Sequence, residues 1–108
     1  MTEPTDAVVV LSTAPSEEEA GAIARRLVEE RLVACVNLIP RVRSIYSWRG
    51  EVHDEGEVLM VMKTRAALGD EVARRVAELH SYTCPEAITL PVVGGAAAYL
   101  AWVSEVTG

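Results

Sequence analysis

The sequence predicts an α+β fold of the ferredoxin-like type, in which a four-stranded sheet carries two helices on one face. The first observation is the order of the local patterns, which runs strand, helix, strand, strand, helix, strand and ends in one added helix. Two split βαβ units have this order. The second is size: 108 residues, half of them hydrophobic, suit one core and not two, so we expect a single domain over residues 1–108.

The first strand and the first helix are predicted from the N-terminal third. Residues 6–13 form a nearly continuous apolar run rich in valine, which is typical of a central strand covered on both faces. Ser16 and Glu19 then have the spacing of a capping box, and acidic residues crowd the first turn. Apolar residues recur at helical spacing up to Val28, so we expect an amphipathic helix lying on the sheet.

A long β-hairpin is predicted in the middle of the chain. Residues 34–48 have an extended pattern, residues 48–51 supply a turn, and a second extended run reaches Lys63. Pro40 has no N–H to donate, so it marks an edge position or a bulge. At ~3.3 Å per residue the first arm would be about 50 Å long, whereas a domain of this size has a radius of gyration of about 13 Å. We therefore expect the hairpin to overhang its own core.

The last third predicts a helix, a strand and a short final helix. Residues 64–80 return to helical spacing, with Gly69 as a weak point. Residues 87–93 alternate apolar and polar side chains, which indicates the fourth strand. Residues 96–106 form the final helix, which has almost no polar face, so we expect its burial on more than one side.

The overhang implies that one copy of the chain is not enough. The far end of the hairpin carries Tyr46, Trp48 and Val52, which would leave apolar area and unpaired strand edges exposed in a monomer. A neighbouring subunit would cover them, so we expect an oligomer and specifically a trimer. The alternative is that Pro40 breaks the arm into a shorter, folded-back strand, with Trp48 closing the core.

Composition argues against several partners. The formal charge is −6, whereas a nucleic-acid surface needs a concentrated excess of Lys and Arg, and anionic membranes are disfavoured for the same reason. No basic region followed by an apolar stretch opens the chain, and no apolar run approaches the ~18 residues of a membrane span. We expect a cytoplasmic protein.

Cys35 and Cys84 are too few for a disulfide scaffold, so free thiols are predicted.

Several segments together resemble the CutA family, the divalent-cation tolerance proteins, over essentially the whole chain. They are residues 8–15, 34–40, 44–51, 63–64, 80–86, 90–92 and 99–102. Their order and spacing make the likeness specific. The resemblance implies a ferredoxin-like homotrimer similar to the nitrogen-regulatory PII proteins, with clefts between subunits, cytoplasmic residence and a link to copper and other divalent metals.

The chain also departs from the family pattern. Ser12 stands where copper-associated members can carry Cys, and Leu79 and His80 stand where they can carry paired histidines. Ser81 replaces the usual proline between His and Tyr. Only His80 carries over, which counts against tight copper binding at the family site.

His80 and Cys84 are the candidate metal ligands, because neutral imidazole and thiolate suit copper or zinc, and Glu86 adds a nearby carboxylate. Alternatively, His80 is a surface group stabilised by a helix end, and Cys84 is an inert packing residue.

An acidic cluster opens the second hairpin arm and is a second candidate. Its members are Glu51, His53, Asp54, Glu55 and Glu57. Alternation places His53, Glu55 and Glu57 on one side, where they could hold a hard or borderline cation. Alternatively, these charges solvate an exposed strand and pair with arginines of the opposite arm. Those are Arg41, Arg43 and Arg49.

The resemblance places six side chains near the clefts between subunits. They are Tyr46, Trp48, Lys63, His80, Tyr82 and Trp102. Aromatic walls with one or two charges suit a small anion or metabolite, although Trp48 and Trp102 can instead be interface anchors. We expect a trimeric metal-tolerance protein that binds copper, another divalent cation or a small ligand. The alternative is a PII-like metabolite sensor that acts through a protein partner.

The sequence lacks the residues that three other functions would require. An RNA-binding module needs aromatic residues on its central strands, and residues 58–62 have none. The loop at residues 12–16 has no paired thiolates of a soft-metal chaperone, and no positive charge or glycine-rich cradle for phosphoryl chemistry. No nucleophile has a recognisable base, so we do not expect an enzyme.

Overall fold

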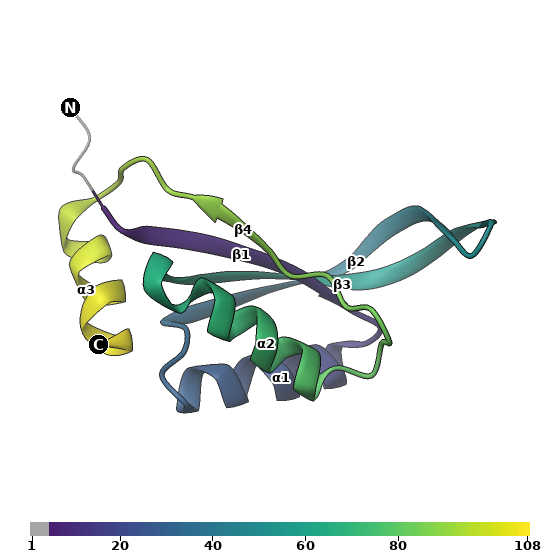
Figure 1. Ribbon diagram of the computed structural model, residues 1–108, viewed down its shortest axis with the longest axis horizontal. Coiled ribbons are helices and arrows are strands. Elements are labelled where there is room, and N and C mark those ends of the chain that lie inside the picture. The colour runs from purple at the N-terminus through teal and green to yellow at the C-terminus, as the bar shows by residue number, and fades with distance from the viewer. Residues whose placement is uncertain (1–4) are drawn as a thin grey trace.

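The computed structural model describes residues 5–108, and its elements follow the predicted order (Figure 1). The strands are β1 (Ala7–Ala14), β2 (Cys35–Trp48), β3 (Glu51–Arg65) and β4 (Ile88–Pro91). The helices are α1 (Glu17–Glu29), α2 (Gly69–Leu79) and α3 (Ala97–Thr107), with a 3₁₀ turn at Ala66–Leu68. The strands form one antiparallel sheet in the order β2-β3-β1-β4, so the ferredoxin-like prediction is confirmed.

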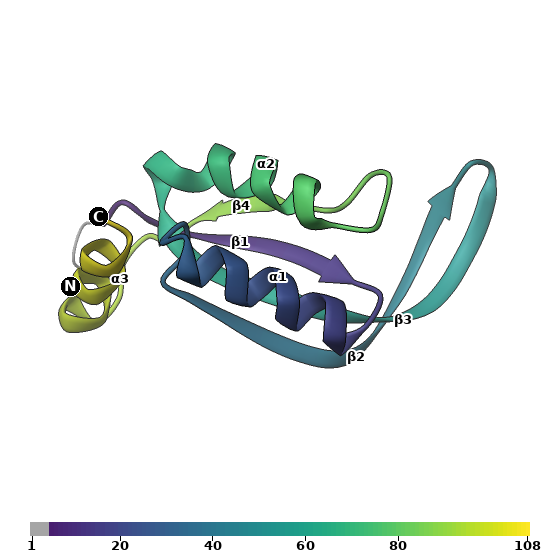
Figure 2. The same cartoon turned by 90° about the horizontal axis from the view of Figure 1, so that it is seen from below.

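Helices α1 and α2 lie side by side on one face of the sheet and bury the core against it (Figure 2). Within this core, the largest fully buried apolar side chains are Val10, Leu27, Val33, Met60, Met62, Val72 and Val76. Residues of β1 alternate between buried and half-buried positions. The expectation that β1 is covered on both faces is therefore not met within one chain, because both helices occupy the same face.

The start of α1 forms half of the predicted capping box. The Ser16 hydroxyl oxygen accepts a hydrogen bond from the Glu19 backbone N–H at 3.1 Å. The Glu19 carboxylate does not return to Ser16 but accepts the backbone N–H of Ser81 at 2.9 Å. This contact ties the beginning of α1 to the loop that follows α2.

The β2–β3 hairpin projects well beyond the helices, as predicted (Figures 1 and 2). The pairing register shifts between Ile39 and Val42, and Arg41 has a φ of 62°, so the proline segment forms the expected bulge. Arg49 and Gly50 close the hairpin with φ values of 52° and 79°, which match the right-handed twist of a two-residue hairpin turn. The alternative of a shorter, folded-back arm is wrong.

Two predicted boundaries are wrong. The helix predicted at residues 64–80 begins at Gly69, because Thr64 and Arg65 still belong to β3. The Thr64 hydroxyl donates to the Leu32 carbonyl oxygen at 2.6 Å and so holds this end of the strand. Gly69 is therefore the first residue of α2 rather than a weak point inside it.

The fourth strand is also shorter than predicted, since it ends at Pro91.

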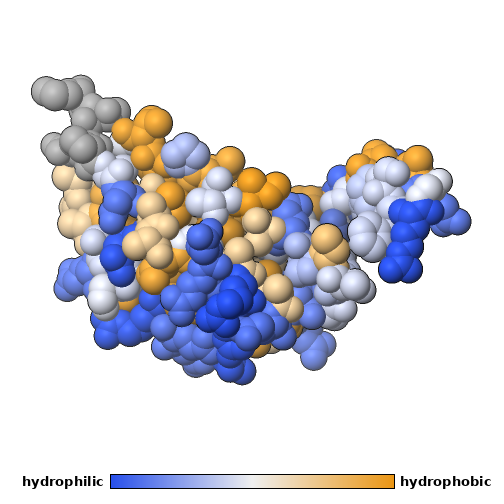
Figure 3. Space-filling model, in the orientation of Figure 1, coloured by the Kyte–Doolittle hydropathy of each residue, from blue (hydrophilic) through white to orange (hydrophobic). Residues whose placement is uncertain are grey.

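Much apolar surface stays uncovered in one chain. Of α3, only Val103 and Thr107 are buried, whereas Tyr99 and Trp102 are 43% and 40% exposed. The expected burial of this helix on several sides is thus not met within one chain. Hydrophobic surface also gathers along β4 and at the far end of the hairpin (Figure 3). Among residues 5–108, no helix is long and apolar enough to cross a membrane.

An ion-pair network joins the two core helices at their surface. Both Glu30 carboxylate oxygens accept from the Arg75 guanidinium, each at 2.8 Å, and Arg26 adds a contact at 3.2 Å. The hydrogen bond from Arg75, followed by that from Arg26, lowers the pKa of Glu30 from its ordinary 4.5 to about 2. The network fixes the end of α1 against α2.

This network predicts a loss of stability in acid. Because the folded-state pKa of Glu30 lies below the unfolded value, its contribution is present above pH 4.5 and is lost as pH falls toward about 2. Urea midpoints measured between pH 6 and pH 2 should fall less steeply for Glu30→Gln than for the wild type. Glu29→Gln, at the neighbouring exposed position, serves as the control and should keep the wild-type slope. Equal slopes for wild type and Glu30→Gln would contradict this account.

Candidate functional site

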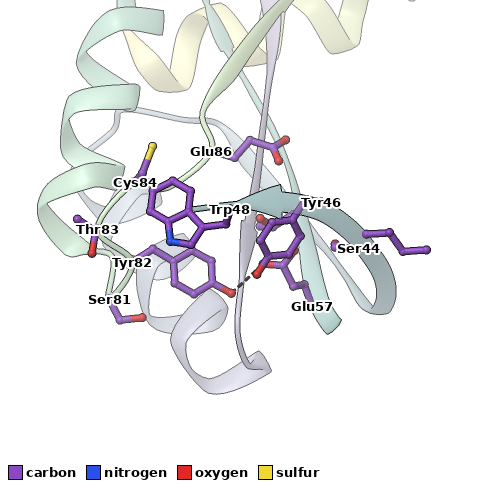
Figure 4. A pocket seen from close by; sticks show the side chains of 11 residues that line it. Ser44, Tyr46, Trp48, Glu57, Ser81, Tyr82, Thr83, Cys84 and Glu86 are labelled. Carbon is purple, nitrogen blue, oxygen red and sulfur yellow. Dashed lines mark hydrogen bonds between the residues drawn. The ribbon is translucent and has the colours of Figure 1, made fainter. Parts of the chain in front are cut away.

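A cleft of about 640 Å³ lies between the hairpin and the loop that follows α2 (Figure 4). The hairpin supplies one wall and the loop at residues 81–86 supplies the other. The lining residues are Thr13, Ser44, Ile45, Tyr46, Trp48, Glu57, Ser81, Tyr82, Thr83, Cys84 and Glu86. A cleft of this size suits a small ligand.

Strand alternation explains which hairpin residues reach the cleft. Tyr46 and Trp48 point to the same side of β2 because they are two residues apart. His53, Glu55 and Glu57 of β3 share that side, as predicted, since the Tyr46 ring stacks on His53 with centroids 5.2 Å apart. The bulge at Pro40 turns this part of the arm away from the main sheet and toward the loop.

Two tyrosines of the cleft are fixed by carboxylates. The Tyr82 hydroxyl donates to Glu57 Oε2 at 2.7 Å, and the Tyr46 hydroxyl donates to Glu55 Oε2 at 3.0 Å. Burial raises the pKa of Tyr82, and the neighbouring Glu57 raises it further. Burial and Glu55 likewise raise the pKa of Tyr46. Both side chains therefore remain neutral phenols at physiological pH.

The charged side chains that line the cleft are both acidic. Glu57 is only 8% exposed, and Glu86 is half-buried. Burial raises the pKa of Glu86, and the charge of Glu57 raises it further. An anion would be repelled here, so the expectation of a small anion does not agree with the charge of the lining.

His80 does not line the cleft but contacts two residues that do, Thr13 and Tyr82. Its side chain is completely buried. Nε2 lies 2.7 Å from the Thr13 carbonyl oxygen, and Nδ1 lies 3.0 Å from the Tyr82 backbone nitrogen. A backbone N–H only donates and a carbonyl only accepts, so Nδ1 is the acceptor and Nε2 carries the proton. Both nitrogens are engaged, and a metal would have to break one of these bonds.

Of the other predicted ligand residues, Cys84 lies in the cleft, whereas Lys63 and Trp102 lie outside it. Cys84 is an exposed free thiol on the cleft wall. Lys63 lies elsewhere, with its Nζ donating to Asn37 Oδ1. Trp102 packs against Tyr99 on α3, at the end of the sheet opposite the hairpin (Figure 1). One chain therefore unites Tyr46, Trp48 and Tyr82, but not Lys63 or Trp102.

The hairpin arginines form part of the predicted pairing with the acidic cluster. Arg43 forms a bidentate pair with Asp54 at 2.8 and 2.6 Å, on the side away from Tyr46. Arg49 instead lies over the Trp48 ring, with its guanidinium carbon 5.3 Å from the ring centroid. Within residues 5–108, no group of three or more His, Cys, Asp or Glu side chains is arranged to hold a metal ion.

Comparison with known proteins decides the family. The family model described as CutA1 divalent ion tolerance protein matches residues 8–106. The chain belongs to this CutA1 family. The divalent-cation tolerance protein CutA of Thermus thermophilus is 50% identical over 100 residues, which are 93% of this chain and 97% of that protein. A solved structure of Cut A1 from Thermus thermophilus has a TM-score of 0.91 at 49% identity and covers 94% of this chain and 99% of that chain.

Two further CutA relatives correct the predicted location. CutA of Archaeoglobus fulgidus, described as periplasmic, is 38% identical with a TM-score of 0.91 and covers 94% of this chain and 99% of that chain. The Arabidopsis thaliana protein named CutA, chloroplastic, is 39% identical over 93% of this chain, which spans 55% of that protein. The cytoplasmic prediction is therefore wrong, because CutA relatives are assigned to other compartments.

The role of His80 leads to a stability prediction. His80→Ala removes two hydrogen bonds at a fully buried side chain and leaves the Thr13 carbonyl and the Tyr82 N–H without their partner. We expect a loss of about 2–4 kcal/mol in the free energy of unfolding, measured by urea denaturation. His53→Ala, at the hairpin surface, is the matched control and should cost less than about 1 kcal/mol. Equal losses in the two variants would contradict the supporting role.

Proposed function

We propose that the chain acts in divalent-cation tolerance as a single-domain subunit of a homotrimer whose clefts bind cations, copper among them. The observation that supports this proposal is the chemistry of the cleft, whose lining contains the carboxyl groups of Glu57 and Glu86 and the exposed thiol of Cys84. Carboxylates attract divalent cations, and thiolate adds affinity for copper and zinc. A binding role agrees with the family description, which names ion tolerance and not a reaction.

The proposed ligands from one chain are Cys84 and Glu86. Both belong to the loop after α2 and both line the cleft. His80 keeps this loop in place through its bond to the Tyr82 backbone rather than by binding the ion. Two ligands are fewer than a closed metal site needs, so we propose that a neighbouring subunit supplies the remainder.

The uncovered surfaces support the trimer. The helix-free face of the sheet, α3 and the hairpin end all expose large apolar side chains. Exposed apolar surface of this extent is typical of an interaction site. A trimer would cover it, and it could bring Lys63 and Trp102 of one copy toward the cleft of the next.

A second candidate function follows from the size of the cleft. A cation needs far less than about 640 Å³, whereas aromatic walls around such a volume are typical of a site for a small organic molecule. We therefore also propose a regulator that senses a metabolite and acts through a protein partner, in the manner of the PII proteins.

The metal proposal is tested by equilibrium dialysis with Zn²⁺ and Cu²⁺. We expect Cys84→Ser to weaken binding by about tenfold or more, because the thiolate ligand is lost. Cys35→Ser is the matched control, because Cys35 lies on β2 outside the cleft and is also a free thiol. The proposal fails if the two serine variants bind either ion as the wild type does.

The trimer is tested by light scattering coupled to size-exclusion chromatography. We expect a mass three times the 11.7 kDa of one chain at micromolar concentration. Leu90→Lys should lower this mass, because Leu90 is 42% exposed on β4 and a lysine there would be buried in the interface. A wild-type mass equal to that of one chain would exclude the trimer.

A further inference from the structure

We infer that the cleft binds an organic ammonium ion, that is, a ligand with a positively charged, alkylated nitrogen. This inference deepens the second candidate function by naming the class of its ligand. It rests on the cleft being a ligand site and not on the proposed metal ligands.

The aromatic side chains of the cleft come from its two walls. Tyr46 and Trp48 belong to the hairpin, and Tyr82 belongs to the facing loop (Figure 4). The face of an aromatic ring carries negative charge density, which attracts a cation within about 6 Å of the ring centroid. Three such rings around one cavity form a cage whose walls attract positive charge without coordinating it.

One ring of the cage already holds a cation of the chain itself. The Arg49 guanidinium lies 5.3 Å from the centroid of Trp48. Trp48 lines the cleft, whereas Arg49 does not. The contact shows that the position of Trp48 is compatible with a cation–π interaction.

The carboxylates reinforce the rings. The Tyr46 and Tyr82 hydroxyls each donate to a carboxylate oxygen, which fixes both rings and increases their electron density. Glu57 and Glu86 add two carboxyl groups to the lining of the same cavity. Since Glu57 is only 8% exposed, its charge is weakly screened by solvent, and it acts on a ligand more strongly than a surface carboxylate would.

The alternatives fit this lining less well. An anion would be repelled by both glutamates, and a neutral apolar molecule would make no use of them. A small inorganic cation would bind the carboxyl and thiol groups proposed above as its ligands, and it would make no use of the three aromatic rings. An alkylated ammonium ion is weakly hydrated and needs only a negative, partly apolar surface.

The test compares two probes of similar shape by isothermal titration calorimetry. Tetramethylammonium chloride carries the charge, and tert-butanol is its neutral counterpart. We expect the wild-type protein to bind tetramethylammonium at least about tenfold more tightly than tert-butanol. Equal affinity for the two probes, or no measurable binding of tetramethylammonium, would overturn the inference.

Two pairs of variants separate the rings from the charge. Trp48→Leu should weaken tetramethylammonium binding by about three- to tenfold, whereas Trp48→Phe should keep most of the affinity because it retains a ring. Glu57→Gln should also weaken binding, since its amide oxygen can still accept from Tyr82 but its charge is gone. Glu29→Gln is its control, because it removes the same charge and because Glu29 is exposed on α1 and does not line the cleft. Trp48→Leu and Trp48→Phe of equal affinity would overturn the inference.

A parallel Zn²⁺ titration of the wild type separates this inference from the metal proposal. Zinc binding without tetramethylammonium binding would overturn only the ammonium site. Tetramethylammonium binding without zinc binding would support the ammonium site and exclude the metal.

Discussion

The β2–β3 hairpin is longer than the sheet to which it belongs, and the rest of the molecule follows from this mismatch. Strand β1 pairs with residues 58–65 of β3 only, so the earlier part of β3 has β2 as its one partner among the described residues. An unsupported two-stranded ribbon twists strongly, and the bulge after Ile39 adds to this twist. The ribbon consequently leaves the plane of the sheet and carries its aromatic side chains toward the loop after α2.

The opposite wall of the cleft depends on polar contacts rather than on packing. The loop after α2 lacks regular structure, so its backbone groups need other partners. His80 bridges Thr13 of β1 and the Tyr82 backbone, and the Glu19 carboxylate accepts from Ser81. Tyr82 then reaches across to Glu57 on the hairpin. A histidine that resembles a metal ligand in the sequence is thus part of the frame that positions the binding surface.

Several elements could be predicted because their causes are local. The Ser16 cap, the bulge at Pro40 and the turn at Gly50 depend on the chemistry of a few neighbouring residues, and all three were predicted. The start of α2 was predicted wrongly because Thr64 has a helical spacing to later residues, yet its hydroxyl bonds Leu32, which is distant in the sequence. Glu57 was predicted as a member of the acidic cluster, but its hydrogen bond to Tyr82 could not be predicted, because Tyr82 lies 25 residues away in the sequence.

The sequence by itself determined the order of the elements, the overhang of the hairpin and membership of the CutA1 family, because periodicity, turn residues and spaced motifs are properties of the linear chain. Only the tertiary structure decided which predicted ligand residues meet. It placed Tyr46, Trp48 and Tyr82 in one acidic cleft, buried His80 against two residues of the lining, and left Lys63 and Trp102 outside the cleft. The physical reason is that strand register, ribbon twist and loop anchoring set the distances between side chains that are far apart in the sequence.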